Sequence, residues 1–150
     1  MPNLHTFIGE PERKIEQDVL HWLGNREYCL KQATVKNTSG ASITVTDPIG
    51  YPLKVVSGEY EPALAGDEAN AVAIIAGGTQ AKYLTLADDG TIQLLVLVRG
   101  PAIIKYDGIP AKDYAAAAFD KADIETALAA LDMPILTVKS GTNATVTEGM

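Results

Sequence analysis

Residues 76–82, Ala-Gly-Gly-Thr-Gln-Ala-Lys, are the part of the chain that comes nearest to a phosphate-binding loop. Such a loop needs the spacing GxxxxGK[ST], because backbone amides and the lysine must converge on one phosphate. The segment lacks this spacing, and paired glycines after an apolar run are typical of a turn that ends a strand. The sequence therefore predicts a turn here.

Histidine and cysteine offer no metal or thiol chemistry. His5 and His21 lie far apart, and neither has a cysteine or carboxylate at the spacing of metal ligands. Cys29 is the only cysteine, which excludes an internal disulfide and a CxxC site. We expect no metal and no cofactor.

The acidic residues are the remaining catalytic candidates. They lie in expected turns and helix starts, where aspartate is favoured because its side chain bonds nearby amides. Nothing singles out a carboxylate pair of the kind that hydrolases use, and no serine occupies a GxSxG elbow. The residue types and their spacings therefore disfavour an enzyme. The aspartates considered are Asp88, Asp89, Asp107, Asp113, Asp120 and Asp123.

Trp22 and Tyr28 suggest binding rather than catalysis. Large aromatic side chains on a polar segment resemble anchors for a partner surface, although they could equally close over the domain's own core. The net charge of −7 argues against binding to nucleic acid or anionic membrane, which draws on clustered lysine and arginine. The sequence shows neither a membrane-spanning apolar run nor a secretory signal.

The chain of 150 residues is expected to form one domain behind a distinct N-terminal segment. In that segment Ile15, Val19, Trp22 and Leu23 have helical spacing, but an extended arm broken at Gly24-Asn25 is the alternative. The residue pattern leaves both interpretations open.

Two strand-turn-strand patterns predict β-hairpins. Residues 33–35 and 43–45 flank Asn-Thr-Ser-Gly, and residues 82–86 and 91–98 flank Asp-Asp-Gly. Residues 59–70 are acidic and are expected to form a loop.

The other expected strands are 53–56, 71–76 and 135–138. Residues 71–76 are apolar on both faces and should be buried, whereas Pro48 and Pro52 disfavour a central position for 53–56. Asp120 is expected to cap a helix that Pro134 ends. Together these expected elements predict an α+β fold: a small strand-rich single domain with a short C-terminal helix and an extended N-terminal arm.

Arg99-Gly100-Pro101 interrupts two β-forming runs, and the interruption predicts a sheet corner. Gly100 permits a sharp backbone, and Pro101 removes a donor where strand pairing lapses. Arg99 either faces a neighbouring subunit or an acidic loop, or it is solvated.

Residues 95–103, 124–131 and 134–137 resemble, in order and spacing, the head decoration proteins of lambda-like tailed phages. Residues 71–76 stand where that family carries an Ala-Val-Gly-Ile-Leu strand, and residues 18–35 resemble the family's N-terminal arm. The chain departs from the family pattern in residues 77–80, in the long 37–52 segment and after residue 137.

The resemblance implies a capsid-cementing protein without enzymatic activity. It would be made in the host cytoplasm and bind as a homotrimer to the major capsid protein on the outer surface of the expanded head in the virion. It implies an arm over residues 1–33, a domain over 34–139 and a polar tail over 140–150. It also assigns capsid binding to arm residues and a subunit interface to Arg99; the arm residues are Val19, Leu20, Trp22, Leu23, Tyr28 and Val35.

The alternative function is a carbohydrate- or host-surface-binding module displayed on a virion or cell. It would use the aromatic residues Tyr51, Tyr60 and Tyr83, which this interpretation expects to be exposed.

Overall fold

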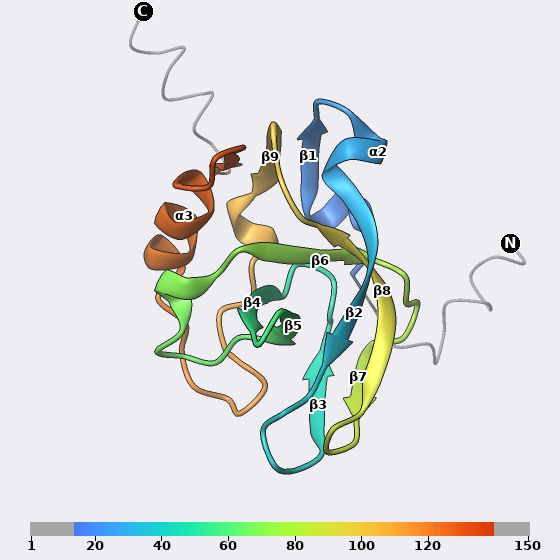
Figure 1. The fold of residues 1–150 in the computed structure, drawn as a ribbon. Coiled ribbons are helices and arrows are strands. Elements are labelled where there is room, and N and C mark those ends of the chain that lie inside the picture. The colour runs from blue at the N-terminus through green and yellow to red at the C-terminus, as the bar shows by residue number, and fades with distance from the viewer. Residues whose placement is uncertain (1–13, 140–150) are drawn as a thin grey trace, which may run out of the picture.

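A five-stranded closed barrel forms the centre of the computed structural model, which describes residues 14–139 (Figure 1). Around the barrel the pairing order is β2, β5, β4, β6 and β8. The β2–β5 contact is parallel and the other four contacts are antiparallel. Closure pairs each barrel strand on both sides, which removes open sheet edges. The strands are Leu30–Lys36 (β2), Pro52–Val56 (β4), Glu59–Pro62 (β5), Ala73–Gly77 (β6) and Thr91–Leu97 (β8).

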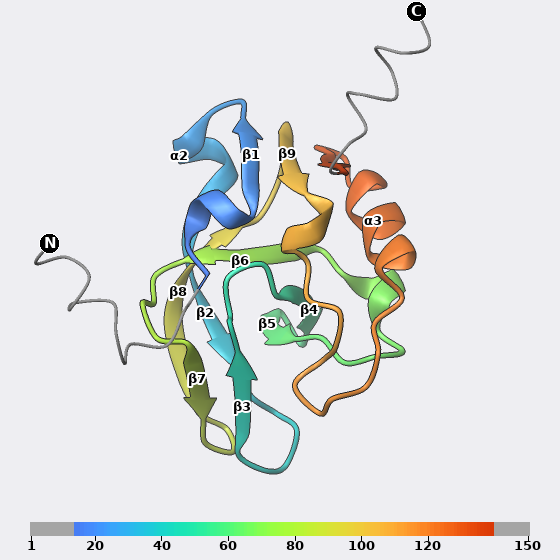
Figure 2. The ribbon, with the colours of Figure 1, turned by 180° about the vertical axis from the view of Figure 1, so that it is seen from behind.

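A three-stranded sheet lies at one end of the barrel. Its order is β1 (Leu20–Leu23), β9 (Ala102–Lys105) and β10 (Ile135–Val138), with β1 antiparallel and β10 parallel to β9. Figures 1 and 2 show β1 and β9 side by side at this end, with α2 (Arg26–Cys29) on one flank and α3 (Lys121–Ala129) on the other.

The opposite end carries a two-stranded sheet of β3 (Ile43–Thr46) and β7 (Tyr83–Leu86). Three single 3-10 turns complete the described elements: η1 (Glu16–Asp18), η2 (Glu68–Asn70) and η3 (Tyr106–Gly108).

One hydrophobic core joins the barrel, both sheets and α3. Strand β6 is buried along its whole length, as its apolar sequence predicts, and Ile124 and Leu128 bury one stripe of α3. Tyr51 reaches into this core, where its hydroxyl donates to the carbonyl of Ala63 (2.6 Å) and accepts from the amide of Tyr114 (3.0 Å). A hydroxyl buried this deeply needs such partners.

The predicted fold class is confirmed: the described chain is a strand-rich single domain with a short helix near its C-terminal end. The Asp120 cap is also confirmed, since its side chain accepts from the amide of Asp123. Near the N-terminus the extended interpretation holds at Leu20–Leu23, with a single 3-10 turn before it. Helix α3 ends at Ala129, before Pro134 could end it.

Both predicted hairpins are wrong in their pairing, although their strands exist. β2 pairs with β8, and β3 pairs with β7, so each expected partner lies in a different sheet. The predicted loop at 59–70 contains β5. Strand β4 is paired on both sides, so the prediction that it is not central is wrong. Pro52 is tolerated because it is the first residue of the strand. Its carbonyl accepts from the amide of Ala63 (3.0 Å), and no backbone N–H is needed from it.

Residues 14–33, which the resemblance assigns to an arm, lie against the domain in this structure. They contain β1, α2 and the first part of β2, and Val19 is fully buried. The remaining residues of the predicted arm, 1–13, and the predicted tail, 140–150, lie outside the described residues.

Candidate binding surface

The Arg99-Gly100-Pro101 corner joins three parts of the chain. The amide of Gly100 donates to the carbonyl of Met133 (2.8 Å), just before β10. The carbonyl of Pro101 accepts from the amide of Gly24 (2.9 Å), just before α2, and from the thiol of Cys29 (3.6 Å), the last residue of α2. The predicted corner is therefore present, and it fixes β1, α2 and β10 relative to one another.

Arg99 lies against Tyr28 of its own chain. Its guanidinium donates to the carbonyl of Tyr28 (3.0 Å), and its Cζ lies 4.7 Å from the centroid of the Tyr28 ring. This is the geometry of a cation–π contact. No carboxylate of the described residues forms a salt bridge with Arg99.

An apolar row crosses the outer face of the three-stranded sheet. Trp22 in β1 and Leu136 in β10 both stand opposite Ile103 in β9, and directly opposed residues share one face of a sheet. Trp22 is 50% exposed and Leu136 is 49% exposed, whereas Ile104 and Ile135 are fully buried. The row therefore faces away from the core.

We call the exposed and partly exposed residues of this end the corner surface. Of the eight large apolar side chains that are exposed within residues 14–139, Trp22, Tyr28 and Leu136 belong to it, and Met133 lies beside Gly100. Trp, Tyr and Arg are the types that dominate binding energy at protein interfaces. The members of the corner surface are Trp22, Tyr28, Arg99, Pro101, Ile103 and Leu136.

Only part of the predicted binding set reaches this surface. Tyr28 and Arg99 contact each other there, and Trp22 lies two residues before Gly24, which donates to Pro101. Val19 and Val35 are fully buried, and Leu20 and Leu23 are partly buried against the core. In this conformation the buried valines support the domain and cannot contact a partner.

Sequence reasoning did not assign Pro101 or Leu136 to a binding surface. Alternation within Ile135–Val138 could have placed Leu136 on the face opposite Ile135, but only the strand order shows that this face continues to Trp22.

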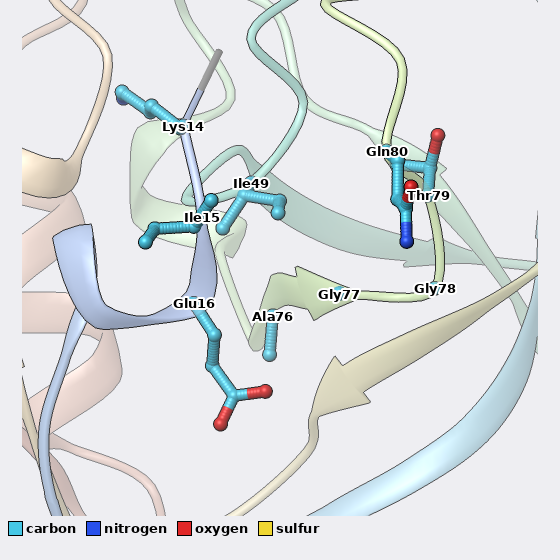
Figure 3. Close-up of a pocket in the computed structure, with 9 residues that line it drawn as sticks. All are labelled: Lys14, Ile15, Glu16, Ile49, Ala76, Gly77, Gly78, Thr79 and Gln80. Atoms are coloured by element: carbon cyan, nitrogen blue, oxygen red, sulfur yellow. The ribbon is translucent and has the colours of Figure 1, made fainter. Parts of the chain in front are cut away.

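A groove of about 400 Å³ lies between η1 and the loop that follows β6 (Figure 3). Lys14, Ile15 and Glu16 form one side, and Gly78, Thr79 and Gln80 form the other. The ammonium of Lys14 donates to the carbonyl of Gly108 (2.8 Å), and burial lowers the pKa of this lysine.

The Glu16 carboxylate near this groove belongs to an ion pair. Both of its oxygens accept from the Arg26 guanidinium (2.6 and 2.9 Å), and this hydrogen bonding holds the pKa of Glu16 below its usual value. The pair joins η1 to α2 and so connects the groove side of the N-terminal segment to the corner surface.

The segment first considered as a phosphate loop is a turn, as predicted. Strand β6 ends at Gly77, and the Lys82 ammonium pairs with the Asp47 carboxylate (3.2 Å). The lysine is thus not aimed at a cradle of backbone amides.

Two of the acidic candidates, Asp113 and Asp120, have side chains that stabilise the fold. Asp113 accepts from the amides of Ala65, Ala115 and Ala117 and orders the loop before α3. Within residues 14–139 no three His, Cys, Asp or Glu side chains are grouped to hold a metal ion. None of the helices in this part of the chain is long and apolar enough to span a membrane.

The aromatic set expected for sugar binding does not form. Tyr51 is 1% exposed and its hydroxyl is hydrogen-bonded within the core, so its ring is not accessible for stacking on a ligand. Tyr83 is exposed on β7, and Tyr60 is partly buried on β5.

Comparisons with protein-family models, with curated proteins and with solved structures found no match to this chain.

Proposed function

We propose that the chain is a head decoration protein of a lambda-like tailed phage. It binds as a homotrimer to the outer surface of the expanded head and stabilises the capsid. The proposal rests on the resemblance in residues 95–103, 124–131 and 134–137.

The packing of these segments supports the proposal. Strand β8 runs through the corner into β9, β10 pairs with β9, and α3 packs against β10. Gly100 also approaches Pro134 closely. The segments that carry the resemblance thus form one packed unit, which is the observation that carries the proposal.

The binding mechanism uses the chain that precedes Lys14. On the capsid this segment adds a strand to the edge of a capsid subunit, and its backbone hydrogen bonds supply affinity. A single arm supplies only one such contact and binds weakly. Three arms on one trimer make the later contacts intramolecular and raise the apparent affinity by about 10² or more.

Co-sedimentation with phage heads tests this function. The heads are assembled from the major capsid protein of the phage that encodes this chain, as precursor and as expanded particles. We expect the chain to be a trimer by light scattering and to sediment with expanded heads only. A stable monomer, or equal binding to both kinds of particle, would contradict the proposal.

A further inference from the structure

The corner surface concentrates apolar exposure at one place. Single exposed apolar side chains are normal on soluble proteins and carry no information. Here Trp22 and Leu136 flank Ile103 in one cross-strand row, and Tyr28 is linked to the same corner through Arg99. A cluster of this composition is the pattern expected of a binding site.

The surface is also held in a fixed conformation. Trp22 belongs to a paired strand, and Gly24, two residues later, donates to Pro101. Asn25 caps α2 by accepting from the amide of Tyr28 (3.0 Å), and Arg99 binds the Tyr28 carbonyl. A partner would therefore meet side chains whose backbone is already ordered, which lowers the entropy lost on binding.

The size of the surface argues against a permanent contact between copies of this chain. A large aromatic residue offers about 150–250 Å² when fully buried. Trp22, Tyr28 and Leu136 are each about half exposed, so together they offer a few hundred Å² at most. A stable interface needs about 800 Å² from each partner. The surface fits a weak contact that is repeated many times.

Charge defines the partner further. Arg99 carries a positive charge that no carboxylate within residues 14–139 pairs with, although the chain as a whole is acidic. Its contacts with Tyr28 use one nitrogen and one ring face, so other N–H groups remain for a partner's carboxylate.

We propose that the corner surface is a second capsid contact, independent of the chain that precedes Lys14. The capsid subunit presents an apolar recess for Trp22 and Leu136 and a carboxylate for Arg99. This inference rests on the proposed function, because a capsid repeats the same weak contact around the trimer and raises its apparent affinity.

The test compares matched variants of the full chain on expanded heads. Trp22→Ala combined with Leu136→Ala removes the row, and Tyr83→Ala is the control, because Tyr83 is 57% exposed on β7 at the opposite end of the molecule. Arg99→Gln tests the charge. Urea unfolding and light scattering first establish that each variant is folded and trimeric.

We expect the double variant to bind expanded heads at least about 10-fold more weakly than the original chain. Arg99→Gln should weaken binding by less than the double variant does. Tyr83→Ala should bind like the original chain. Full binding by the double variant, while the original chain also binds, would overturn this inference and leave the proposed function intact. A folded double variant that is monomeric would overturn it too, because the occupant would then be a second copy. Failure of the original chain to bind expanded heads would overturn the proposed function together with this inference.

Discussion

Gly100 stands where two backbone segments approach too closely for any side chain. A Cβ atom at this position would lie 1.7 Å from the carbonyl oxygen of Pro134 and 2.6 Å from its carbonyl carbon. Both are backbone atoms, so neither can rotate away. The glycine between Arg99 and Pro101 is therefore required by the packing of β10 against the corner.

Gly100→Ala should lower the free energy of unfolding by more than about 3 kcal/mol, because relieving the overlap must move β10 away from β9. Urea unfolding followed by circular dichroism measures the change.

Gly77→Ala is the matched control for that substitution. A Cβ at Gly77 would meet only side-chain atoms of Leu95, at 3.6 Å or more, and a carboxylate oxygen of Glu16 at 4.0 Å, all of which are ordinary contacts. We expect a change within about 1 kcal/mol. If both variants lost a similar amount of unfolding free energy, the corner would not be tightly packed around Gly100.

The strands of this fold could be predicted, but their partners could not. Alternation and apolar runs report how a segment is buried, and they place β2, β3, β7 and β8 correctly. The turns between them reverse the chain from one sheet into another. Asn37 stabilises this arrangement, because its side chain donates to the carbonyls of Ala41, Leu86 and Ala87, across both turns. Local turn residues carry no information about such long-range bonds.

In the candidate site, too, part could be predicted from the sequence and part could not. The types of Trp22, Tyr28 and Arg99 suggested binding, and they do lie at one corner. Their relation to Leu136 depends on β10 pairing with β9 across a long separation in the chain. Residue types could therefore be predicted, whereas the surface that they form required the strand order.

Glu68 connects two elements that the sequence did not link. Its carboxylate accepts from the amide of Asp120 at the start of α3 (2.9 Å) and from the amide of Gly66 (2.7 Å). The bond from Asp120, helped by that from Gly66, holds the pKa of Glu68 below its usual value. A carboxyl with a lowered folded pKa adds stability above its unfolded pKa of about 4.3, and this is lost as pH falls through the folded value.

Glu68→Gln should therefore lower the free energy of unfolding by about 1–2 kcal/mol at pH 7, because hydrogen bonds to a charged acceptor are stronger than neutral ones. The difference from the original chain should shrink as the pH falls from about 4.3, where Glu68 of the unfolded chain takes up a proton, through the lower pKa that Glu68 has in the folded protein. Urea unfolding at pH 7, 5 and 4 measures it.

Asp132→Asn is the control for this pH series, since Asp132 is exposed just after α3. It should change the unfolding free energy by less than about 0.5 kcal/mol at each pH. An equal effect of Glu68→Gln at every pH would exclude the charge as the source of its stabilisation.

The N-terminal segment is part of the domain from Lys14 onwards. The carbonyl of Val19 accepts from the amide of Lys105 (2.7 Å), and the carbonyl of Gln17 accepts from its ammonium (2.6 Å). Strand β1 then covers one edge of β9. An arm that ended at residue 33 would have to give up all of these contacts to move.

Two truncations test where the domain begins. Removal of residues 2–13 should leave a cooperatively folding domain, because the strands that close the barrel and both sheets lie within residues 14–139. Removal of residues 2–23 should lower the free energy of unfolding by more than about 3 kcal/mol, since it deletes β1 and the buried side chain of Val19. Urea unfolding of both proteins measures the difference.

If the longer truncation were as stable as the shorter one, residues 14–23 would be dispensable for folding and free to act as an arm. On the expected result, the proposed capsid-binding arm would be confined to the chain before Lys14, and the shorter truncation would separate proposed arm binding from proposed binding through the corner surface.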